Sequence, residues 1–250
     1  MKPNAKRRLD QLLVDRGLVE SRARAQALVI AGCVFSGERR LDKPGTPTPE
    51  DMPLEVRGQD HPWVSRGGLK LAHGLATFGF PVEGRVGLDV GASTGGFTDV
   101  LLAAGARRVY AVDVGHGQLA WKLRQDARVT VLERCNARHL TREQVPEPAD
   151  LVVCDASFIG LETVLPAPLS LTAPEAALVA LIKPQFEVGR ERVGKGGVVR
   201  DPALHVEVCD RIAAWVGGLP GWTVKGITES PIKGPEGNVE FLIGAERHAG

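Results

Sequence analysis

The sequence contains no apolar run close to the roughly 18 uninterrupted residues that a membrane-spanning helix needs. Its basic start is interrupted by Asp10, Asp15 and Arg16, which excludes the apolar segment of a secretory signal peptide. We therefore expect no membrane partner and a cytoplasmic location. The composition, 43% hydrophobic and 24% charged, is typical of a soluble globular protein.

Paired metal-ligand motifs are also missing. The four cysteines (Cys33, Cys135, Cys154 and Cys209) form no Cys-x-x-Cys pair, and no histidine stands at the spacing of a zinc ligand. We expect buried thiols in a reducing compartment, without disulfides and without a bound metal.

The net charge of +1 conceals an uneven distribution. Residues 1–43 carry ten Lys or Arg against five Asp or Glu, which leaves 21 against 25 in residues 44–250. Basic charge concentrated in a small segment favours phosphate binding, because each neutralised phosphate releases counterions. A solvated helical face gives the same pattern, so charge alone does not decide between the two.

The first segment predicts two helices followed by short strands. The leucines of residues 9–13 have helical spacing and Gly17 ends that helix. Ser21 is the expected N-cap of a second helix, residues 22–31, with Ala23, Ala27 and Ile30 packed inward. A proline-rich stretch, residues 43–53, predicts a loop or the edge of a small sheet. We expect domains at residues 1–62 and 63–250.

The larger segment alternates between strands and helices, as a doubly wound α/β domain does. Nearly all-apolar stretches predict strands buried on both faces, at residues 86–90, 108–112, 151–154 and 177–182. Residues 222–229 and 239–244 predict two closing strands without a helix between them. Such a pair is expected to be antiparallel and to lie at one edge of the sheet.

A glycine-rich turn follows the strand at residues 86–90 and opens a helix at residues 97–104. Glycines at this place allow a ligand to approach the backbone closely. The spacing is G-x-x-x-G-G and not the G-x-G-x-x-G of dinucleotide sites, so it favours S-adenosylmethionine over NAD. The residues that we predict to bind this cofactor are Asp89, Gly91, Ala92, Ser93, Thr94, Gly95, Gly96 and Phe97.

An acidic residue supports a nucleoside cofactor. Asp113 lies 22 positions after Gly91, at the end of the strand predicted for residues 108–112. A carboxylate there can accept hydrogen bonds from both hydroxyls of an adenosine ribose. A strand-ending aspartate in an ordinary turn is the alternative.

Further polar side chains stand where an open α/β sheet places its chemistry. Asp155 and Lys183 each follow an apolar strand, and Glu240 lies inside the expected last strand. Lys70 lies in a Gly-containing segment just after the domain boundary. Any one of these charges alone is also compatible with a surface position.

These motifs occur in order along a chain that resembles the TlyA family of ribosomal RNA ribose 2′-O-methyltransferases, some of which carry a haemolysin label. The resemblance covers residues 7–244. The segments that carry it are RLDQLLVDRGLVESRARAQALVIAGCV, VSRGGLKL, LDVGASTGGFTDVLL, AVDVGHGQL, NARHL, CDASFIGL, LIKPQFEVGRERVGKGGVVRD and SPIKGPEGNVEFL.

The resemblance implies a small α-L RNA-binding domain, like that of a small-subunit ribosomal protein. It also implies an FtsJ-like, Rossmann-like catalytic domain whose seven-stranded sheet has an antiparallel last strand. The implied catalytic tetrad is Lys70, Asp155, Lys183 and Glu240, and Asn136 joins the cofactor residues. Lys183 would be the base that removes the proton of a ribose 2′-hydroxyl, Asp155 would orient it, and Glu240 would hold Lys70 or the ribose.

Basic residues are the expected contacts to ribosomal RNA or ribosomal subunits, through shape and phosphates more than bases. In the first segment they are Arg7, Arg8, Arg22, Arg24, Arg39 and Arg40; in a loop after Lys183 they are Arg190, Arg192 and Lys195. Arg22 and Arg24 lie in a first helical turn, where the helix dipole disfavours cations, and a bound polyanion would account for them.

Three alternatives stay open. The chain could be an RNA-binding protein with a non-catalytic methyltransferase-like domain, a membrane-active haemolysin, or an NAD-dependent oxidoreductase. The complete tetrad, the absence of a lytic helix and the turn spacing argue against them in that order. The target nucleotide, which the resemblance suggests is a cytidine, and the oligomeric state do not follow from the residues.

Overall fold

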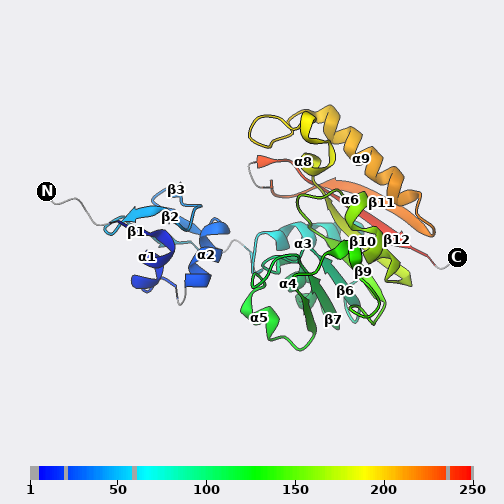
Figure 1. Cartoon of the computed structure of the whole chain (residues 1–250), viewed down its shortest axis with the longest axis horizontal. Coiled ribbons are helices and arrows are strands. Elements are labelled where there is room, and N and C mark those ends of the chain that lie inside the picture. Colours follow the sequence, from blue (N-terminus) through cyan, green and yellow to red (C-terminus); the bar gives the residue numbers. More distant parts are fainter. Residues whose placement is uncertain (1–5, 20–21, 58–60, 235–236, 249–250) are drawn as a thin grey trace. The chain divides into compact units, whose positions relative to one another are not determined.

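The computed structural model describes residues 6–19, 22–57, 61–234 and 237–248. The chain forms two compact units, Met1–Pro62 and Trp63–Gly250 (Figure 1). The expected N-cap Ser21 lies outside the described residues.

The smaller unit contains two helices and five short strands. They are β1 (Lys6–Arg8), α1 (Leu9–Asp15), α2 (Arg22–Ile30), β2 (Val34–Ser36), β3 (Arg39–Arg40), β4 (Pro47–Pro49) and β5 (Glu55–Val56). Strand β1 pairs antiparallel with β4, and β2 pairs antiparallel with both β3 and β5. The proline-rich stretch thus contributes β4 as one strand of a two-stranded sheet.

The predicted inward stripe of the second helix is wrong. The buried residues of α2 are Ala25, Leu28 and Val29, whereas Ile30 is 70% exposed. Both stripes contain apolar residues at helical spacing, so periodicity alone did not separate them. Contact with Leu9 and Leu13 of α1 decides which stripe is buried, because Ala25, Leu28 and Val29 pack into the same core.

The larger unit is an α/β domain. Its strands are β6 (Val86–Val90), β7 (Arg108–Val112), β8 (Val129–Leu132), β9 (Ala149–Cys154), β10 (Thr172–Ile182), β11 (Trp222–Glu229) and β12 (Phe241–Arg247). Its longer helices are α3 (Gly67–Phe78), α4 (Gly96–Ala103) and α9 (Pro202–Gly217). Its short helices are α5 (Trp121–Arg124), η1 (Ala137–His139), α6 (Leu161–Val164), α7 (Pro166–Ser170), α8 (Pro184–Glu187) and η2 (Arg190–Arg192).

The seven strands form one sheet in the order β11-β12-β10-β9-β6-β7-β8. Strands β10, β9, β6, β7 and β8 are mutually parallel, and β12 is antiparallel to both β10 and β11. The expected fold class is confirmed, including the antiparallel last strand and the closing pair at one edge.

Alternation along the strands divides the core between the two faces of the sheet, because successive side chains point to opposite sides. Leu178 and Ala180 of β10 pack on one face with residues of α6, α7 and α9, whereas Val179 and Leu181 pack on the other with α3 and α4. Helices therefore cover both faces (Figure 1), which explains why the central strands are continuously apolar.

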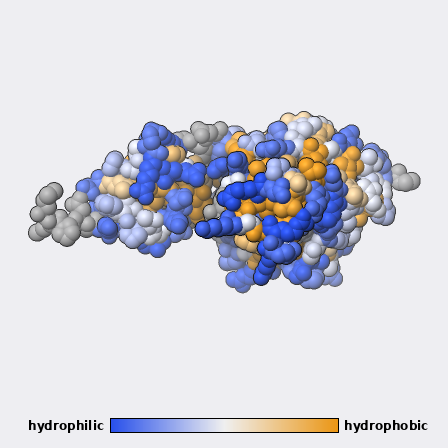
Figure 2. Space-filling model, turned by 90° about the horizontal axis from the view of Figure 1, so that it is seen from above, coloured by the Kyte–Doolittle hydropathy of each residue, from blue (hydrophilic) through white to orange (hydrophobic). Residues whose placement is uncertain are grey.

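The face seen in Figure 2 is mostly hydrophilic, with apolar side chains showing on part of the larger unit. Within the described residues, no helix has both the length and the apolar character that crossing a bilayer requires. The expectation of four buried thiols holds for Cys33 and Cys154, whereas Cys135 and Cys209 are partly exposed. Both of these lie outside the central strands.

Candidate functional site

A cleft of about 670 Å³ opens at the carboxyl ends of β6, β7 and β9. Val90, Val112 and Asp155, which stand at or directly after the ends of these strands, form part of its wall. Strand β6 has β7 on one side and β9 on the other, so the chain order reverses here. An open α/β sheet binds its ligands at such a switch point.

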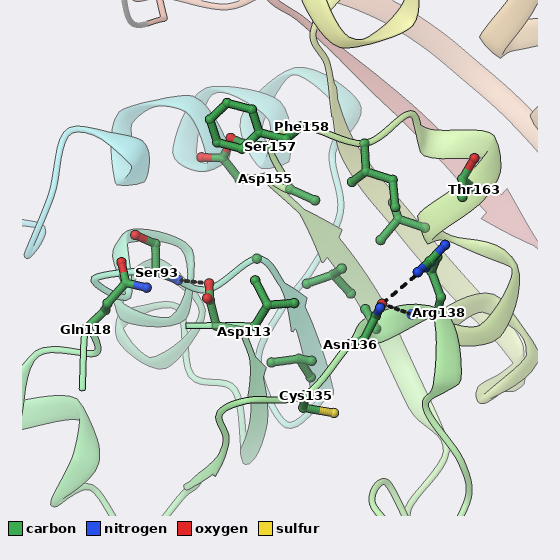
Figure 3. Close-up of a pocket in the computed structure, with 18 residues that line it drawn as sticks. Ser93, Asp113, Gln118, Cys135, Asn136, Arg138, Asp155, Ser157, Phe158 and Thr163 are labelled. Atoms are coloured by element: carbon green, nitrogen blue, oxygen red, sulfur yellow. Dashed lines mark hydrogen bonds between the residues drawn. The ribbon is translucent and has the colours of Figure 1, made fainter. Parts of the chain in front are cut away.

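One end of the cleft presents the carboxylate of Asp113. The backbone N–H of Ser93 donates to its Oδ2 (2.8 Å) and the backbone N–H of Gly115 donates to its Oδ1 (2.6 Å) (Figure 3). Two backbone donors fix the orientation of this carboxylate. Each oxygen keeps a further lone pair that a ligand hydroxyl can use.

Asn136 lines the same cleft. Its Oδ1 accepts a hydrogen bond from the backbone N–H of Arg138 (3.1 Å), so its side chain caps the short helix η1 (Figure 3). The charged side chains of the wall are Asp113, Asp155 and Arg138.

The glycines of the turn are also needed for packing within the protein. Gly91 has a φ of +83°, and a Cβ there would lie 2.9 Å from the backbone nitrogen of Ala156. A Cβ at Gly95, whose φ is +97°, would lie 2.2 Å from a methyl group of Leu123. These glycines therefore permit the close approach of neighbouring protein segments.

The predicted cofactor residues divide into two groups. Gly91, Ser93, Asp113 and Asn136 line the cleft. The others do not line it; they are Asp89, Ala92, Thr94, Gly95, Gly96 and Phe97. Ala92, in the turn, and Phe97, in α4, are instead buried in the core on the side of the sheet that α3 and α4 cover.

Asp89 lies behind the cleft wall and is fully buried. The hydroxyl of Thr98 donates to its Oδ2 (2.6 Å), while Oδ1 has no hydrogen-bond partner among the described residues. Burial, with smaller contributions from the charges of Asp155 and Asp113, raises the pKa of Asp89 to about 7.

Lys183 follows β10 and is 6% exposed. Its Nζ lies 2.6 Å from Asp155 Oδ1 and donates to the backbone oxygen of Asp155 (3.1 Å) and to Ser157 Oγ (2.9 Å). Because Lys183 directly follows β10, its ammonium group lies beside the segment that follows β9.

Lys70 and Glu240 form a second ion pair. Lys70 Nζ donates to Glu240 Oε2 (2.5 Å), and the two residues are 7% and 1% exposed. The prediction that Glu240 lies inside the last strand is wrong, because β12 begins at Phe241. Its backbone oxygen instead accepts a hydrogen bond from Ser230, just after β11.

Strand register brings the two pairs to the same edge of the sheet. Ile182 of β10 opposes Phe241 of β12, so Lys183 and Glu240 stand at the next position along this antiparallel pair. At the start of α3, one turn before Lys70, a Cβ on Gly67 would lie 3.7 Å from Asp155 Oδ2. The structure therefore gathers all four predicted tetrad residues, of which Asp155 lines the cleft.

Residues 63–247 match the FtsJ-like methyltransferase family, and residues 7–51 match the S4 domain. The chain belongs to the FtsJ-like methyltransferase family. The resemblance inferred from the motifs is confirmed, and the oxidoreductase alternative has no support.

Curated relatives are similar to this chain over most of its length. YqxC of Bacillus subtilis, whose name describes an rRNA methyltransferase, is 50% identical over 95% of this chain and 85% of its own. The 16S/23S rRNA (cytidine-2'-O)-methyltransferase TlyA of Mycobacterium tuberculosis is 49% identical over 94% of this chain and 88% of its own. A solved, hemolysin-named protein from Streptococcus thermophilus has a TM-score of 0.76 at 44% identity, and the match covers 98% of this chain and 89% of that one.

The methyltransferase cleft has side chains that the sequence argument did not assign. Ser157 and Phe158 line it, and Phe158 is 89% exposed with a φ of +65°. Its ring lies 4.9 Å from that of Phe186, and both rings line a second cleft of about 510 Å³. Ser157 and Phe158 closely follow Asp155 in the sequence, and this was the available signal. Residues that follow the end of a strand lie at the same edge of the sheet as that end.

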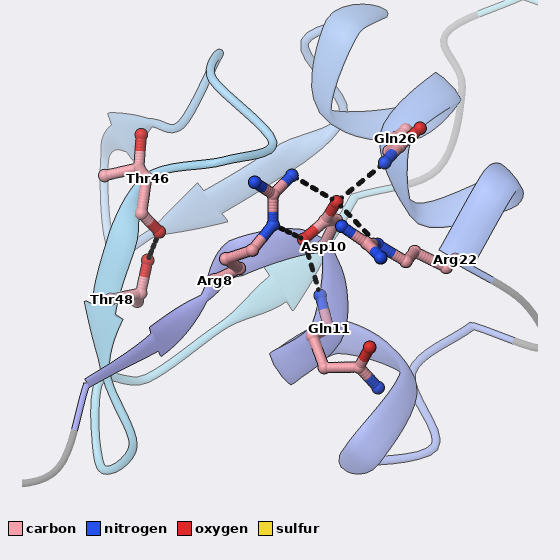
Figure 4. A network of polar contacts seen from close by, with 7 residues as sticks. All are labelled: Arg8, Asp10, Gln11, Arg22, Gln26, Thr46 and Thr48. Carbon is pink, nitrogen blue, oxygen red and sulfur yellow. Dashed lines mark hydrogen bonds and ion pairs between the residues drawn. The ribbon is translucent and has the colours of Figure 1, made fainter.

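The basic residues predicted to bind RNA differ in what they contact. Arg8 and Arg22 pair with the buried Asp10 (2.9 and 3.0 Å) (Figure 4). Arg7 pairs with Asp15 (2.7 Å) and Glu50 (2.5 Å). Arg39 and Arg40 form the exposed strand β3.

In the methyltransferase unit, Arg192 pairs with Glu207 (2.5 Å). Arg190 lines the second cleft, and Lys195 is exposed on the loop that follows. Several predicted RNA contacts therefore also hold the fold together.

Proposed function

We propose that this methyltransferase transfers the methyl group of S-adenosylmethionine to a ribose 2′-hydroxyl of cytidine in ribosomal RNA. The observation that carries the proposal is the Lys183–Asp155 pair, which lies at the edge of a cleft whose other end holds Asp113. Its relatives' names supply the cytidine and the ribosomal RNA.

The cleft fits the cofactor in chemistry and size. Asp113 can accept hydrogen bonds from the two ribose hydroxyls of the cofactor. A volume of about 670 Å³ lies within the range of small-molecule sites. The bound cofactor supplies an electrophilic methyl group.

The protein's own contribution is to position the alcohol and to remove its proton. A ribose hydroxyl is a poor nucleophile until its proton is withdrawn as attack develops. Lys183 is the proposed base, and Asp155 fixes its Nζ within 2.6 Å. Glu240 holds the ammonium of Lys70 so that a second cation stays beside the site without an uncompensated buried charge.

The S4 unit is proposed to bring the RNA to this cleft. The predicted arginines of this unit, Arg7, Arg8, Arg22, Arg24, Arg39 and Arg40, would contact phosphates. On the methyltransferase unit, Arg190, Arg192 and Lys195 would hold the RNA near the cleft. Contacts of this kind depend steeply on salt, because they release counterions.

The test is transfer of labelled methyl from S-adenosylmethionine to free ribosomal RNA, to separate subunits and to whole ribosomes, followed by mapping of the modified ribose. We expect label on a cytidine 2′-oxygen in at least one of these substrates. Label on a base, or no transfer to any of them, would contradict the proposal.

Lys183→Ala should lower single-turnover methyl transfer by at least about 10³-fold, because the proposed base is removed. Affinity for S-adenosylmethionine, measured by calorimetry, should stay within about threefold of the original. Lys225→Ala is the matched control, since Lys225 pairs with Glu246 (3.3 Å) on strands β11 and β12 and is 45% exposed. Near-normal transfer by Lys183→Ala would remove Lys183 from the mechanism.

A further inference from the structure

The proposed base does not itself reach the cleft. Lys183 is 6% exposed and is not part of the cleft wall. Two residues of the cleft wall, Asp155 and Ser157, contact its Nζ, and Figure 3 shows both of these side chains. A proton that leaves a substrate in the cleft can therefore reach Lys183 through one of these two side chains.

The hydrogen bonds around Lys183 Nζ show which of the two side chains, Asp155 or Ser157, can pass the proton. As an ammonium, Lys183 has three N–H donors; its Nζ donates hydrogen bonds to the Asp155 carbonyl oxygen and to Ser157 Oγ, and it forms an ion pair with Asp155 Oδ1. As a neutral amine it has two N–H donors and one lone pair. The carboxylate and the carbonyl can only accept, so they take the two remaining N–H groups.

The lone pair of the neutral amine then needs a donor. Among these three partners, Ser157 is the one that can turn from acceptor to donor, because a hydroxyl carries both a proton and lone pairs. Its side chain is exposed in the cleft, so its oxygen can at the same time accept a hydrogen bond from a substrate hydroxyl.

We propose that Ser157 is a catalytic residue that relays the proton of the substrate hydroxyl to Lys183; this rests on the proposed function. The ribose 2′-hydroxyl proton passes to Ser157 Oγ while the proton of Ser157 passes to Lys183 Nζ. The freed electron pair of the 2′-oxygen forms the bond to the methyl carbon, and the electrons of the carbon–sulfur bond stay on sulfur. Lys183 ends as the ammonium, with the ion pair and the two hydrogen bonds that the structure shows.

The same hydroxyl resets the site. Lys183 returns its extra proton through Ser157 to solvent once the product has left, because Ser157 is the exposed end of the chain of hydrogen bonds. Asp155 keeps its role throughout: its carbonyl oxygen accepts a hydrogen bond from Lys183 and its carboxylate keeps the ion pair, which leaves the lone pair directed to Ser157.

The experiment compares Ser157→Ala with Ser157→Thr in the full chain. Single-turnover methyl transfer should fall about 100-fold or more in Ser157→Ala, the size of a missing acid–base step, and stay within about fivefold in Ser157→Thr, which keeps the hydroxyl. Calorimetric affinity for S-adenosylmethionine and the thermal unfolding midpoint should be unchanged in both. A rate in Ser157→Ala near that of the unsubstituted protein, or an equal loss in Ser157→Thr, would overturn the relay.

Mixtures of H₂O and D₂O give a readout that a structural role of Ser157 would not change. Two protons move in the relay, so the single-turnover rate should depend on the deuterium fraction along a curve, and the residual rate of Ser157→Ala should follow a straight line. A straight line in the unsubstituted protein would overturn the relay. Absence of any transfer by the unsubstituted protein would instead overturn the proposed function, and the relay with it.

Discussion

Each of the two units buries one aspartate completely, and the two aspartates have opposite surroundings. Asp10 of the S4 unit and Asp89 of the methyltransferase unit are both 0% exposed. Asp10 accepts hydrogen bonds from Arg8, Arg22 and Gln26 (Figure 4). Asp89 has the hydroxyl of Thr98 on one oxygen, and its Oδ1 has no hydrogen-bond partner within the described part of the chain.

The two aspartates therefore have opposite electrostatic properties. Hydrogen bonds from Arg8, Gln26 and Arg22 lower the pKa of Asp10 well below its usual range, against the effect of burial. Asp89 lies deeper in its unit, and this burial raises its pKa to about 7. The difference shows that the depth of a buried carboxylate and its hydrogen-bond partners together decide whether it carries a charge.

The largest expected effect is that of Asp10→Asn, which removes the charge that two arginines surround. The S4 unit should lose about 3 kcal/mol of unfolding free energy, somewhat less than a fully buried pair because both arginines are half exposed. Amide hydrogen exchange of α1 and α2 at neutral pH measures this loss without unfolding the methyltransferase unit.

The loss should shrink at low pH. Because the pKa of Asp10 is lowered in the folded state, its contribution is complete above the unfolded value near 4 and disappears as pH falls through the folded value. An Asp10→Asn protein with undiminished protection of α1 at pH 7 would contradict this account.

Asp89→Asn makes the same chemical change in the methyltransferase unit, and we expect the opposite sign. A raised pKa means that the folded state holds the proton more tightly, so unfolding free energy falls as pH rises from about 4 to about 7. At pH 8 the substitution should stabilise the ligand-free unit by about 2 kcal/mol, since the unpaired amide N–H offsets part of the gain.

Chemical denaturation of the full chain at pH 5 and pH 8 checks this sign. The unsubstituted methyltransferase unit should be less stable at pH 8, and Asp89→Asn should remove most of that difference. Equal destabilisation by Asp89→Asn at both pH values would show that Asp89 is ionised and paired, as Asp10 is.

The smallest expected effect is that of replacing a single arginine of the S4 unit. Such substitutions distinguish arginines that stabilise the unit from those that are proposed only to bind RNA. Arg8→Gln should weaken protection of α1, by less than Asp10→Asn, because Arg22 remains beside the carboxylate. Arg39→Gln, on the exposed strand β3, should leave protection unchanged.

Both substitutions should lower affinity for ribosomal RNA. Each should also reduce the slope of log affinity against log salt by roughly one, because one phosphate fewer is neutralised when the RNA binds. Filter binding over a range of salt concentrations measures this slope. A salt slope unchanged in Arg39→Gln would remove β3 from the proposed RNA surface.

Much of the methyltransferase unit followed from local pattern. Apolar stretches predicted β6 and β7, because strands covered on both faces have few other compositions available. The position of Asp113 at the end of β7 also followed, since a strand end places its next residue at the edge of the sheet. In α2, by contrast, two apolar stripes were equally compatible with the helical period, and contact with α1 decided that Val29 is buried and Ile30 exposed.

The order of residues along the chain thus determined which elements form and which polar side chains end the strands. Tertiary structure decided between the two expected partners of Glu240, which meets Lys70 across 170 residues. It alone decided that Ser157 of the cleft wall contacts Lys183, and that Asp89 accepts no hydrogen bond from a cation within the described part of the chain. The physical reason is that helical and strand periods depend on neighbours within a few positions. Hydrogen bonds and desolvation depend on distances that exist once the sheet has formed.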